Sequence, residues 1–273
     1  MIQRDYPKLF VMILPAAIVF VAFFIVPMAR LAVVGASGEN GLSAYTSMAS
    51  KPRHFESMVA TVLLSFSVTL VALAISTISG LFLVRNRFSG REALVSLLTF
   101  PLAFPGVVIG FLVILTAGRQ GLIGSITQAV TGDKLVFAYS MAGLFVGYLY
   151  FSIPRVILTV MAAAEKLDPA LEEAARSLGA SPWRVMRDVV LPALKPGLIA
   201  SGAICFATSM GAFGTAFTLA TNVDVLPMTI YTEFTLNANI ASAASLSIIL
   251  GLVTWLALFI ARTLSGSSVA ASA

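Results

Sequence analysis

The sequence predicts an all-α, polytopic membrane protein with six transmembrane helices. Its 273 residues are 59% hydrophobic and only 11% charged, whereas a soluble globular chain averages about 25% charged residues. The mean hydropathy is +0.98, and long stretches without a charged residue recur along the chain. These observations exclude an ordinary soluble enzyme, and they predict a chain that lies mostly in the lipid bilayer.

Six apolar stretches are long enough to cross the bilayer, which takes roughly 20 helical residues. We expect a single transmembrane domain over residues 1–273. The spans are expected at about residues 9–29, 57–84, 93–118, 135–164, 196–220 and 237–261. The first stretch exceeds the apolar region of a signal peptide and five more spans follow it, so it is interpreted as a retained helix.

Two of these spans are rich in residues that bend a helix or reduce the bulk of its side chains. Prolines and glycines in the third span favour a kink or a break: Pro101, Pro105, Gly106 and Gly110. Span five is rich in small residues, which permit close helix approach and leave room for a cavity. In both spans these residues either serve transport or simply suit helix packing.

Lysine and arginine residues set the orientation, because cytoplasmic loops near span ends carry most of the positive charge. With this topology eleven of them lie on one side and five on the other, so both termini are expected in the cytoplasm. The net charge of +5 then reflects topology and not nucleic-acid binding, because the basic residues do not form one patch. With one histidine and one cysteine, we expect no metal site and no cofactor.

One cytoplasmic segment, residues 165–192 between spans four and five, is unusually polar. Its first 24 residues hold nine of the 29 charged residues, with a net charge of −1. That balance disfavours a helix lying on anionic lipid, which would be rich in Lys and Arg. Local pairs such as Glu172 with Arg176 explain some of the charges.

The residues that begin and end helices in this segment predict two short helices. Asp168 and Pro169 have the residue types that begin a helix, and Gly179 suits its left-handed end. Ser181 and Pro182 then begin a second helix. The first helix has small alanines beside its glycine stop, a surface that another protein can approach closely.

The segment also carries a recognisable signature: Glu173-Ala174-Ala175, then Gly179, then Val189-Val190-Leu191-Pro192. This pattern resembles the E-A-A-x3-G-x9-I-x-L-P sequence of the membrane subunits of ATP-binding-cassette (ABC) importers, with Val189 in place of the usual isoleucine. The resemblance covers about residues 55–264. It is similar to permeases of the spermidine/putrescine, ferric-iron and aminoethylphosphonate type, a group to which Phe213-Gly214-Thr215 and the stretch 226–231 also point.

The resemblance implies a type I ABC importer permease whose polar segment is a coupling helix seated on a cytoplasmic ATPase. The implied coupling residues are Leu171, Glu173, Ala174, Ala175, Leu178, Gly179, Ala180, Leu191 and Pro192. No G-x-x-x-x-G-K-[ST] loop occurs in the chain, so ATP hydrolysis is expected in a partner and the chain itself is not expected to be an enzyme. The implied partners are two ATP-binding subunits, a second permease, identical or related, and an extracytoplasmic solute-binding protein, at the bacterial inner membrane.

The solute pathway is less clearly marked. Its candidates are polar residues in or near the spans: Arg155, Thr208, Ser209, Asn222 and Asp224. Arg155 lies about 15 Å along the helix from Glu165, where an arginine is either functional or extends toward the headgroups. A polyamine-type solute is favoured, with ferric iron or aminoethylphosphonate as alternatives.

Other classes of protein fit less well. An ion-driven secondary transporter typically has acidic residues at membrane depth, and none lies there in this sequence. A membrane protease needs a nucleophile with a base, or a metal. A chain with one histidine and no expected metal site fits this class poorly. A channel is separated from the importer reading by the coupling signature alone. We expect His54 at the membrane interface and Glu233 in an exposed loop.

Overall fold

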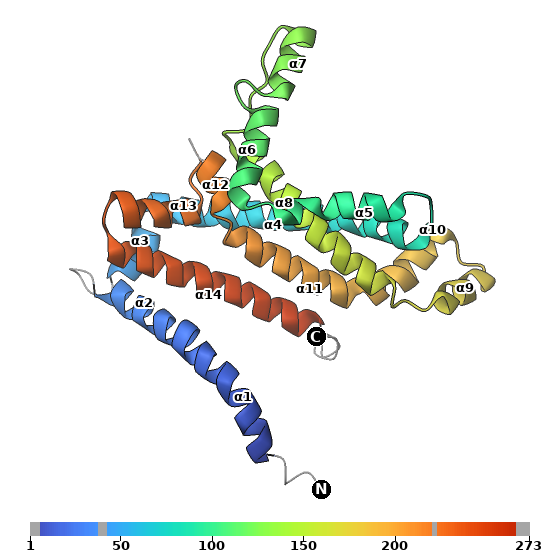
Figure 1. Cartoon of the computed structure of the whole chain (residues 1–273), viewed down its shortest axis with the longest axis horizontal. Helices are drawn as coiled ribbons and strands as arrows, with labels where there is room; N and C mark the ends of the chain where they lie inside the picture. The colour runs from blue at the N-terminus through green and yellow to red at the C-terminus, as the bar shows by residue number, and fades with distance from the viewer. Residues whose placement is uncertain (1–5, 38–42, 220–222, 266–273) are drawn as a thin grey trace. The chain divides into compact units, whose positions relative to one another are not determined.

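The computed structural model describes residues 6–37, 43–219 and 223–265. Every regular element within these ranges is a helix (Figure 1). Six stretches of the described residues are long and apolar enough to cross a membrane: Val11–Ala36, Pro52–Arg85, Gly106–Thr131, Met141–Ala164, Pro182–Met210 and Ile240–Leu264. The predicted all-α class with six candidate spans is therefore confirmed.

The helical elements, in chain order, are α1 (Tyr6–Phe20), η1 (Val21–Ile25), α2 (Val26–Ala36), α3 (Ser43–Ser50), α4 (Pro52–Arg85), α5 (Arg91–Thr99), η2 (Phe100–Ala103), α6 (Gly106–Ala117), α7 (Leu122–Thr131), α8 (Met141–Ala164), α9 (Pro169–Ser177), α10 (Pro182–Val185), η3 (Met186–Val190), α11 (Leu191–Met210), α12 (Gly214–Leu219), α13 (Leu226–Tyr231), η4 (Thr232–Leu236) and α14 (Ile240–Ser265). Their contacts divide the chain into two compact units. The smaller unit comprises the described residues up to Glu56 together with Thr229–Leu252, and the larger one comprises Ser57–Met228 and the described residues from Val253.

In the smaller unit, buried polar side chains tie distant parts of the sequence together. The Tyr45 hydroxyl donates to the Ala32 carbonyl (2.8 Å), and the Ser245 hydroxyl donates to the Ala44 carbonyl (3.0 Å). His54 Nε2 lies 3.4 Å from Glu233 Oε1, and these residues are only 2% and 8% exposed. The expected exposure of Glu233 is therefore wrong, because its carboxylate contacts the buried His54 away from water.

The core of the larger unit lies where α4, α8 and α11 run side by side (Figure 1). Leu64, Val68 and Ala72 recur every four residues and form one buried stripe along α4. Small residues permit the close approach: a Cβ at Gly202 of α11 would lie 3.0 Å from the Leu73 side chain. This packing accounts for part of the small-residue content of span five.

The third predicted span, 93–118, is broken. Helix α5 ends at Thr99, a short 3-10 turn follows, and α6 begins only at Gly106. Prolines 101 and 105 lack the N–H that would continue the helix. The irregularity predicted for this span is therefore present, and the long apolar helical stretch begins at Gly106 and runs on through α7.

The fifth span also differs from its predicted range of 196–220. Helix continues from Pro182 through η3 and α11 to Met210, then stops before α12. The segment η3 is π-helical, and the Leu191 N–H bonds back to the Met186 carbonyl. A π-helical turn widens the backbone just before Pro192, which lets the helix pass through a residue that often ends one.

Candidate functional site

Helix α9 has the ends that its sequence predicts. Asp168 Oδ1 accepts a hydrogen bond from the Ala170 N–H (2.9 Å), and Pro169 is the first helical residue. At the other end Gly179 has φ +81°, and the N–H of Ala180 bonds to the Ala175 carbonyl (3.1 Å). This is a Schellman motif, in which only glycine adopts the left-handed conformation without strain.

The apolar residues of α9 face in two directions. Leu171 is 55% and Leu178 is 89% exposed, and the Ala174 and Glu173 side chains are exposed as well. Ala175 instead packs against the chain's own buried cluster, as does Ala180 just after the helix. The predicted contact residues thus divide into an outward surface and an inward anchor.

The next helix adds an exposed aromatic side chain. Trp183 is 68% exposed, whereas Val190, further along the same helical stretch, is buried. Together with Leu171 and Leu178 it gives the polar segment 165–192 three large exposed apolar side chains, which we call the apolar coupling surface after the role expected of this segment. Our sequence assignment left out Trp183, although a tryptophan in the first turn of a short polar-flanked helix is a usable signal.

Leu191 and Pro192, the last two residues of the signature, lie elsewhere. They line an apolar groove of about 590 Å³ together with Phe66, Leu70 and Leu73 of α4. They therefore lie at the start of α11, next to α4, and are not part of the apolar coupling surface.

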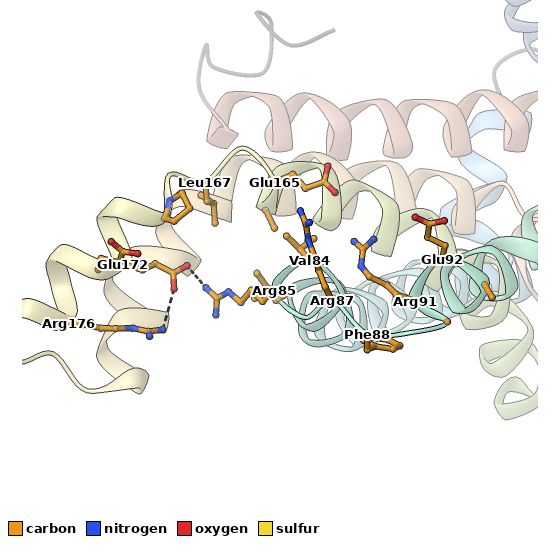
Figure 2. A pocket seen from close by; sticks show the side chains of 16 residues that line it. Val84, Arg85, Arg87, Phe88, Arg91, Glu92, Glu165, Leu167, Glu172 and Arg176 are labelled. Atoms are coloured by element: carbon orange, nitrogen blue, oxygen red, sulfur yellow. Dashed lines mark hydrogen bonds and ion pairs between the residues drawn. The ribbon is translucent and has the colours of Figure 1, made fainter.

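A second cavity, of about 1070 Å³, separates α9 from the turn between α4 and α5 (Figure 2). It is lined by four arginines and four glutamates: Arg85, Arg87, Arg91, Arg176, Glu92, Glu165, Glu172 and Glu173. Arg85, the last residue of α4, donates a hydrogen bond to Glu172 Oε1. Arg176 Nη2 lies 3.8 Å from Glu172 Oε2, so Glu172 is paired with two arginines.

The Glu172–Arg176 pair follows the local spacing that the sequence analysis used. The Arg85–Glu172 bond was not predicted, because it joins residues 87 positions apart. It connects the C-terminal end of α4 directly to α9.

Two of the five pathway candidates lie together in the larger unit. Arg155 of α8 and Thr208 of α11 both line a cavity of about 290 Å³. Its other walls come from α8, from the turn before α6, from the start of α6, and from the turn and helix start around α12: Phe151, Pro101, Leu102, Phe104, Gly106, Ile109, Ala212, Gly214 and Thr215.

The other three candidates do not join this cavity. Ser209 is fully buried among the helices, its hydroxyl has no hydrogen-bond partner, and it is absent from the cavity lining. Asp224 is exposed. Asn222 lies outside the described residues.

Hydrogen bonds hold the cavity walls in place. The Thr215 hydroxyl donates to the Gly106 carbonyl (2.9 Å), and the Tyr148 hydroxyl donates to the Ala212 carbonyl (2.6 Å). The Thr208 hydroxyl donates to the backbone of its own helix, at the Ile204 carbonyl (2.9 Å). Within the described ranges, no group of three or more His, Cys, Asp or Glu residues is placed to hold a metal ion.

Six candidate spans, a capped helix in a polar segment and a polar cavity between helices are the features expected of a membrane permease. Residues 72–267 match the family described as binding-protein-dependent transport system inner membrane component. The chain belongs to this family, and it is therefore an ABC importer permease of the inner membrane.

Relatives of known description support this assignment. The chain is 35% identical over 212 residues to the molybdenum transport system permease protein ModB of Escherichia coli (strain K12), covering 75% of this chain and 92% of ModB. It is 30% identical over 237 residues to PhnU of Salmonella typhi, a proposed 2-aminoethylphosphonate transport system permease protein, covering 85% and 82%. It is 29% identical over 214 residues to sulfate permease 2, chloroplastic, of Chlamydomonas reinhardtii, covering 76% and 57%.

Solved structures share the fold. A bacterial alginate ABC transporter, crystallised in complex with an alginate pentasaccharide-bound periplasmic protein, aligns with a TM-score of 0.79 at 20% identity, covering 97% of this chain and 96% of that one. The MetNI methionine ABC transporter aligns with a TM-score of 0.59 at 19% identity, covering 78% and 94%. These similarities show the architecture of an ABC importer permease.

The polyamine-type solute favoured by the sequence receives no support, because these three relatives are named for molybdenum, 2-aminoethylphosphonate and sulfate. Two stretches pointed to the wider group of spermidine/putrescine, ferric-iron and aminoethylphosphonate permeases, and both have structural roles. Thr215 bonds to Gly106, and a Cβ at Gly214 would lie 3.0 Å from the Val107 nitrogen. The Leu226 N–H donates to the Thr61 hydroxyl (2.8 Å). Residues that hold helices together carry little information about the solute.

Proposed function

We propose that this chain forms half of the translocation pathway of an ABC importer for a small oxyanion, and that α9 is the helix through which ATP hydrolysis drives it. The observation that carries the proposal is the outward surface of α9. Leu171, Leu178 and the nearby Trp183 are large, exposed apolar side chains in an otherwise polar segment, and apolar surface rimmed by polar residues is typical of a protein–protein contact.

The position of α9 supports a mechanical role. Four residues separate it from the end of α8, and Pro182 begins the following helix five residues after Ser177. Its inward side is anchored by Ala175, and Arg85 ties it to α4. A displacement of α9 is therefore transmitted to α8, to α4 and to the helix that begins at Pro182. The short connections leave little flexible loop to absorb it.

The energy source is a separate ATP-binding subunit, because the sequence has no phosphate-binding loop. In the proposed complex two such subunits contact two permease chains, identical or related. A solute-binding protein delivers the oxyanion on the outer side, and both termini lie in the cytoplasm, as the distribution of lysine and arginine predicts.

The proposed solute class rests on the relatives. Molybdenum in aerated water is the tetrahedral dianion molybdate, and sulfate and phosphonates also present tetrahedral groups of negatively charged oxygens. Relatives named for these three solutes match most of the chain. A secondary transporter or a channel would not need the outward surface of α9.

The function is tested by substituting Gly179 and a matched glycine. Gly132 also has φ +81° and open space around its Cβ, but it caps α7, which lies outside the polar segment. Gly179→Leu and Gly132→Leu therefore introduce the same backbone strain, of about 1–2 kcal/mol. Both variants are compared with wild type in proteoliposomes that contain the ATPase, the second permease and the binding protein.

We expect Gly179→Leu to insert normally and to lose ATP-driven uptake by about tenfold or more, since about 1.4 kcal/mol of disturbed docking has that effect. Gly132→Leu is expected to keep uptake close to wild type. Equal uptake by the two variants, at equal membrane levels, would contradict the assignment of α9.

A further inference from the structure

Arg155 is a charged residue inside a candidate span, and its guanidinium has no side-chain or backbone partner among the described residues. The bond recorded at this residue is accepted by its backbone carbonyl from Thr159 (3.1 Å). Within the described part of the chain, no acidic side chain lines the cavity around it. A charged arginine at membrane depth is costly, so an arginine without a carboxylate needs another reason to be there.

The geometry argues against extension to the inner headgroups. Arg155 lies nine residues before the cytoplasmic end of α8 at Ala164, about 14 Å along the helix axis. Side chains in a helix lean toward its N-terminus, which for α8 is away from the cytoplasm. Consistently, Phe151, one turn toward the N-terminus, lines the same cavity.

The walls of the cavity suit a small anion. A guanidinium presents paired N–H donors that match two oxygens of an oxyanion. Helix α6 begins at Gly106 on the cavity wall, so the positive end of its dipole lies there. The Thr208 side chain adds a hydroxyl. A cation would find no negative side chain among the lining residues.

We infer that this cavity is an oxyanion-binding site on the transport path, with Arg155 as the residue that holds the anion. This inference rests on the proposed function and deepens it, because it assigns the solute class to residues of this chain. The cavity volume of about 290 Å³ accommodates a tetrahedral oxyanion with a few waters, each of which occupies about 30 Å³. Two sources offer the same chemistry: the transported anion and the phosphate of a lipid headgroup.

The first experiment measures binding without the solute-binding protein. The assembled transporter is purified in dodecyl maltoside, which carries no phosphate, and its Tm is recorded with added molybdate, sulfate or phosphatidylglycerol. A ligand that binds the folded state raises Tm. We expect molybdate or sulfate to raise the Tm of wild type and of the control Arg30→Gln, an exposed arginine in the middle of α2 that lines no part of this cavity, but not that of Arg155→Gln.

A rise in Tm with phosphatidylglycerol alone would assign Arg155 to a lipid and overturn the inference. An equal rise with the free oxyanions in wild type and Arg155→Gln, or no rise in either, would overturn it as well.

The second experiment measures uptake in proteoliposomes that contain all subunits. Arg155→Gln is expected to lose oxyanion uptake by about tenfold or more, the loss that follows from removing a hydrogen bond to a charged group. ATP hydrolysis stimulated by the binding protein is expected to persist. Arg155→Lys, which keeps the charge but not the paired donors, is expected to recover part of the uptake.

The outcomes separate the inference from the proposed function. If wild type imports one of the three oxyanions and Arg155→Gln imports it equally well, the inference fails and the proposed function stands. If wild type imports none of them, the proposed solute class fails and the inference fails with it. Loss of stimulated ATP hydrolysis in Arg155→Gln would show a general defect and would also contradict the inference.

Discussion

Charged residues are partnered differently in the polar segment 165–192 and in the cavity around Arg155. Around α9, Glu172 pairs with two arginines and Arg187 with Asp188. Such surface pairs contribute about 0–1 kcal/mol each. Arg155 has no acidic neighbour in its cavity, although a charge at the bilayer centre costs at least about 2.5 kcal/mol. Charged residues of the polar segment can thus be substituted at little cost in free energy, whereas the cavity retains Arg155 although its charge is costly there.

The two regions also differ in what they require of their glycines. Gly179 is needed for its backbone conformation, φ +81°, and nothing lies near its Cβ position. Gly110 of α6 is needed for space, because a Cβ there would lie 2.5 Å from the Thr218 Cβ of α12. The cytoplasmic segment is therefore specified by its turns, and the surroundings of the cavity are specified by packing.

The packing side of this comparison predicts the largest effect. Gly110→Leu forces α6 away from α12, and overpacking of this kind costs about 1–3 kcal/mol or more. We expect about tenfold less folded protein in the membrane, which corresponds to about 1.4 kcal/mol. Immunoblots of membranes and Tm values in detergent measure it. The control is Gly251→Leu, since nothing lies within 4 Å of its Cβ position. Wild-type levels and Tm for Gly110→Leu would show that the helices separate easily.

The apolar coupling surface predicts a loss of assembly without a loss of folding. Leu178 is 89% exposed, so Leu178→Asp removes no internal packing. It places a carboxylate where an apolar contact is proposed, and the ATPase retained on affinity purification should fall about tenfold. Leu236→Asp changes an exposed leucine of η4 and serves as the control. Unchanged retention of the ATPase by Leu178→Asp would place the docking surface elsewhere.

The bond between α4 and α9 predicts a smaller effect that charge exchange reverses. Arg85→Glu places two carboxylates together, and the pair contributes up to about 1 kcal/mol, or about fivefold. We expect solute imported per ATP hydrolysed to fall by up to that factor in Arg85→Glu and in Glu172→Arg. The double variant should recover most of the loss, as the double-mutant cycle requires. A double variant no better than either single one would show that the pair does not couple the two helices.

The exposed pair of adjacent residues predicts almost no effect. Arg187 Nε donates to Asp188 Oδ1 (2.6 Å), and both side chains are more than half exposed. In Asp188→Asn, uptake and Tm are expected to stay close to wild type, because water replaces the partner of an exposed charge. A clear loss of uptake in this variant would mean that Asp188 contacts another subunit.

Features fixed by neighbouring residues were predictable from the sequence. Asp168, Gly179 and Ser181 act as helix caps in the structure as expected, because capping depends on residues only two to four positions apart. The prolines around position 101 likewise indicated the break before α6.

Features that join distant parts of the chain were not predictable in this way. The Arg85–Glu172 bond spans 87 positions and the His54–Glu233 contact spans 179. No spacing rule relates such residues, since helix packing brings them together. Packing also decided that Arg155 shares a cavity with Thr208 while Ser209, the next residue, is buried elsewhere.

The continuous helical stretch from Pro182 to Met210 would carry a movement from one of its ends to the other. Its lower end follows the apolar coupling surface, and Thr208 near its upper end lies on the wall of the Arg155 cavity. The 26 residues between Pro182 and Thr208 span about 39 Å. If the stretch pivots at its cytoplasmic end, a tilt of about 5° moves Thr208 by about 3 Å, roughly the length of one hydrogen bond. In the proposed mechanism, a small rotation at the ATPase would then be sufficient to change the distance between Thr208 and Arg155 across their cavity.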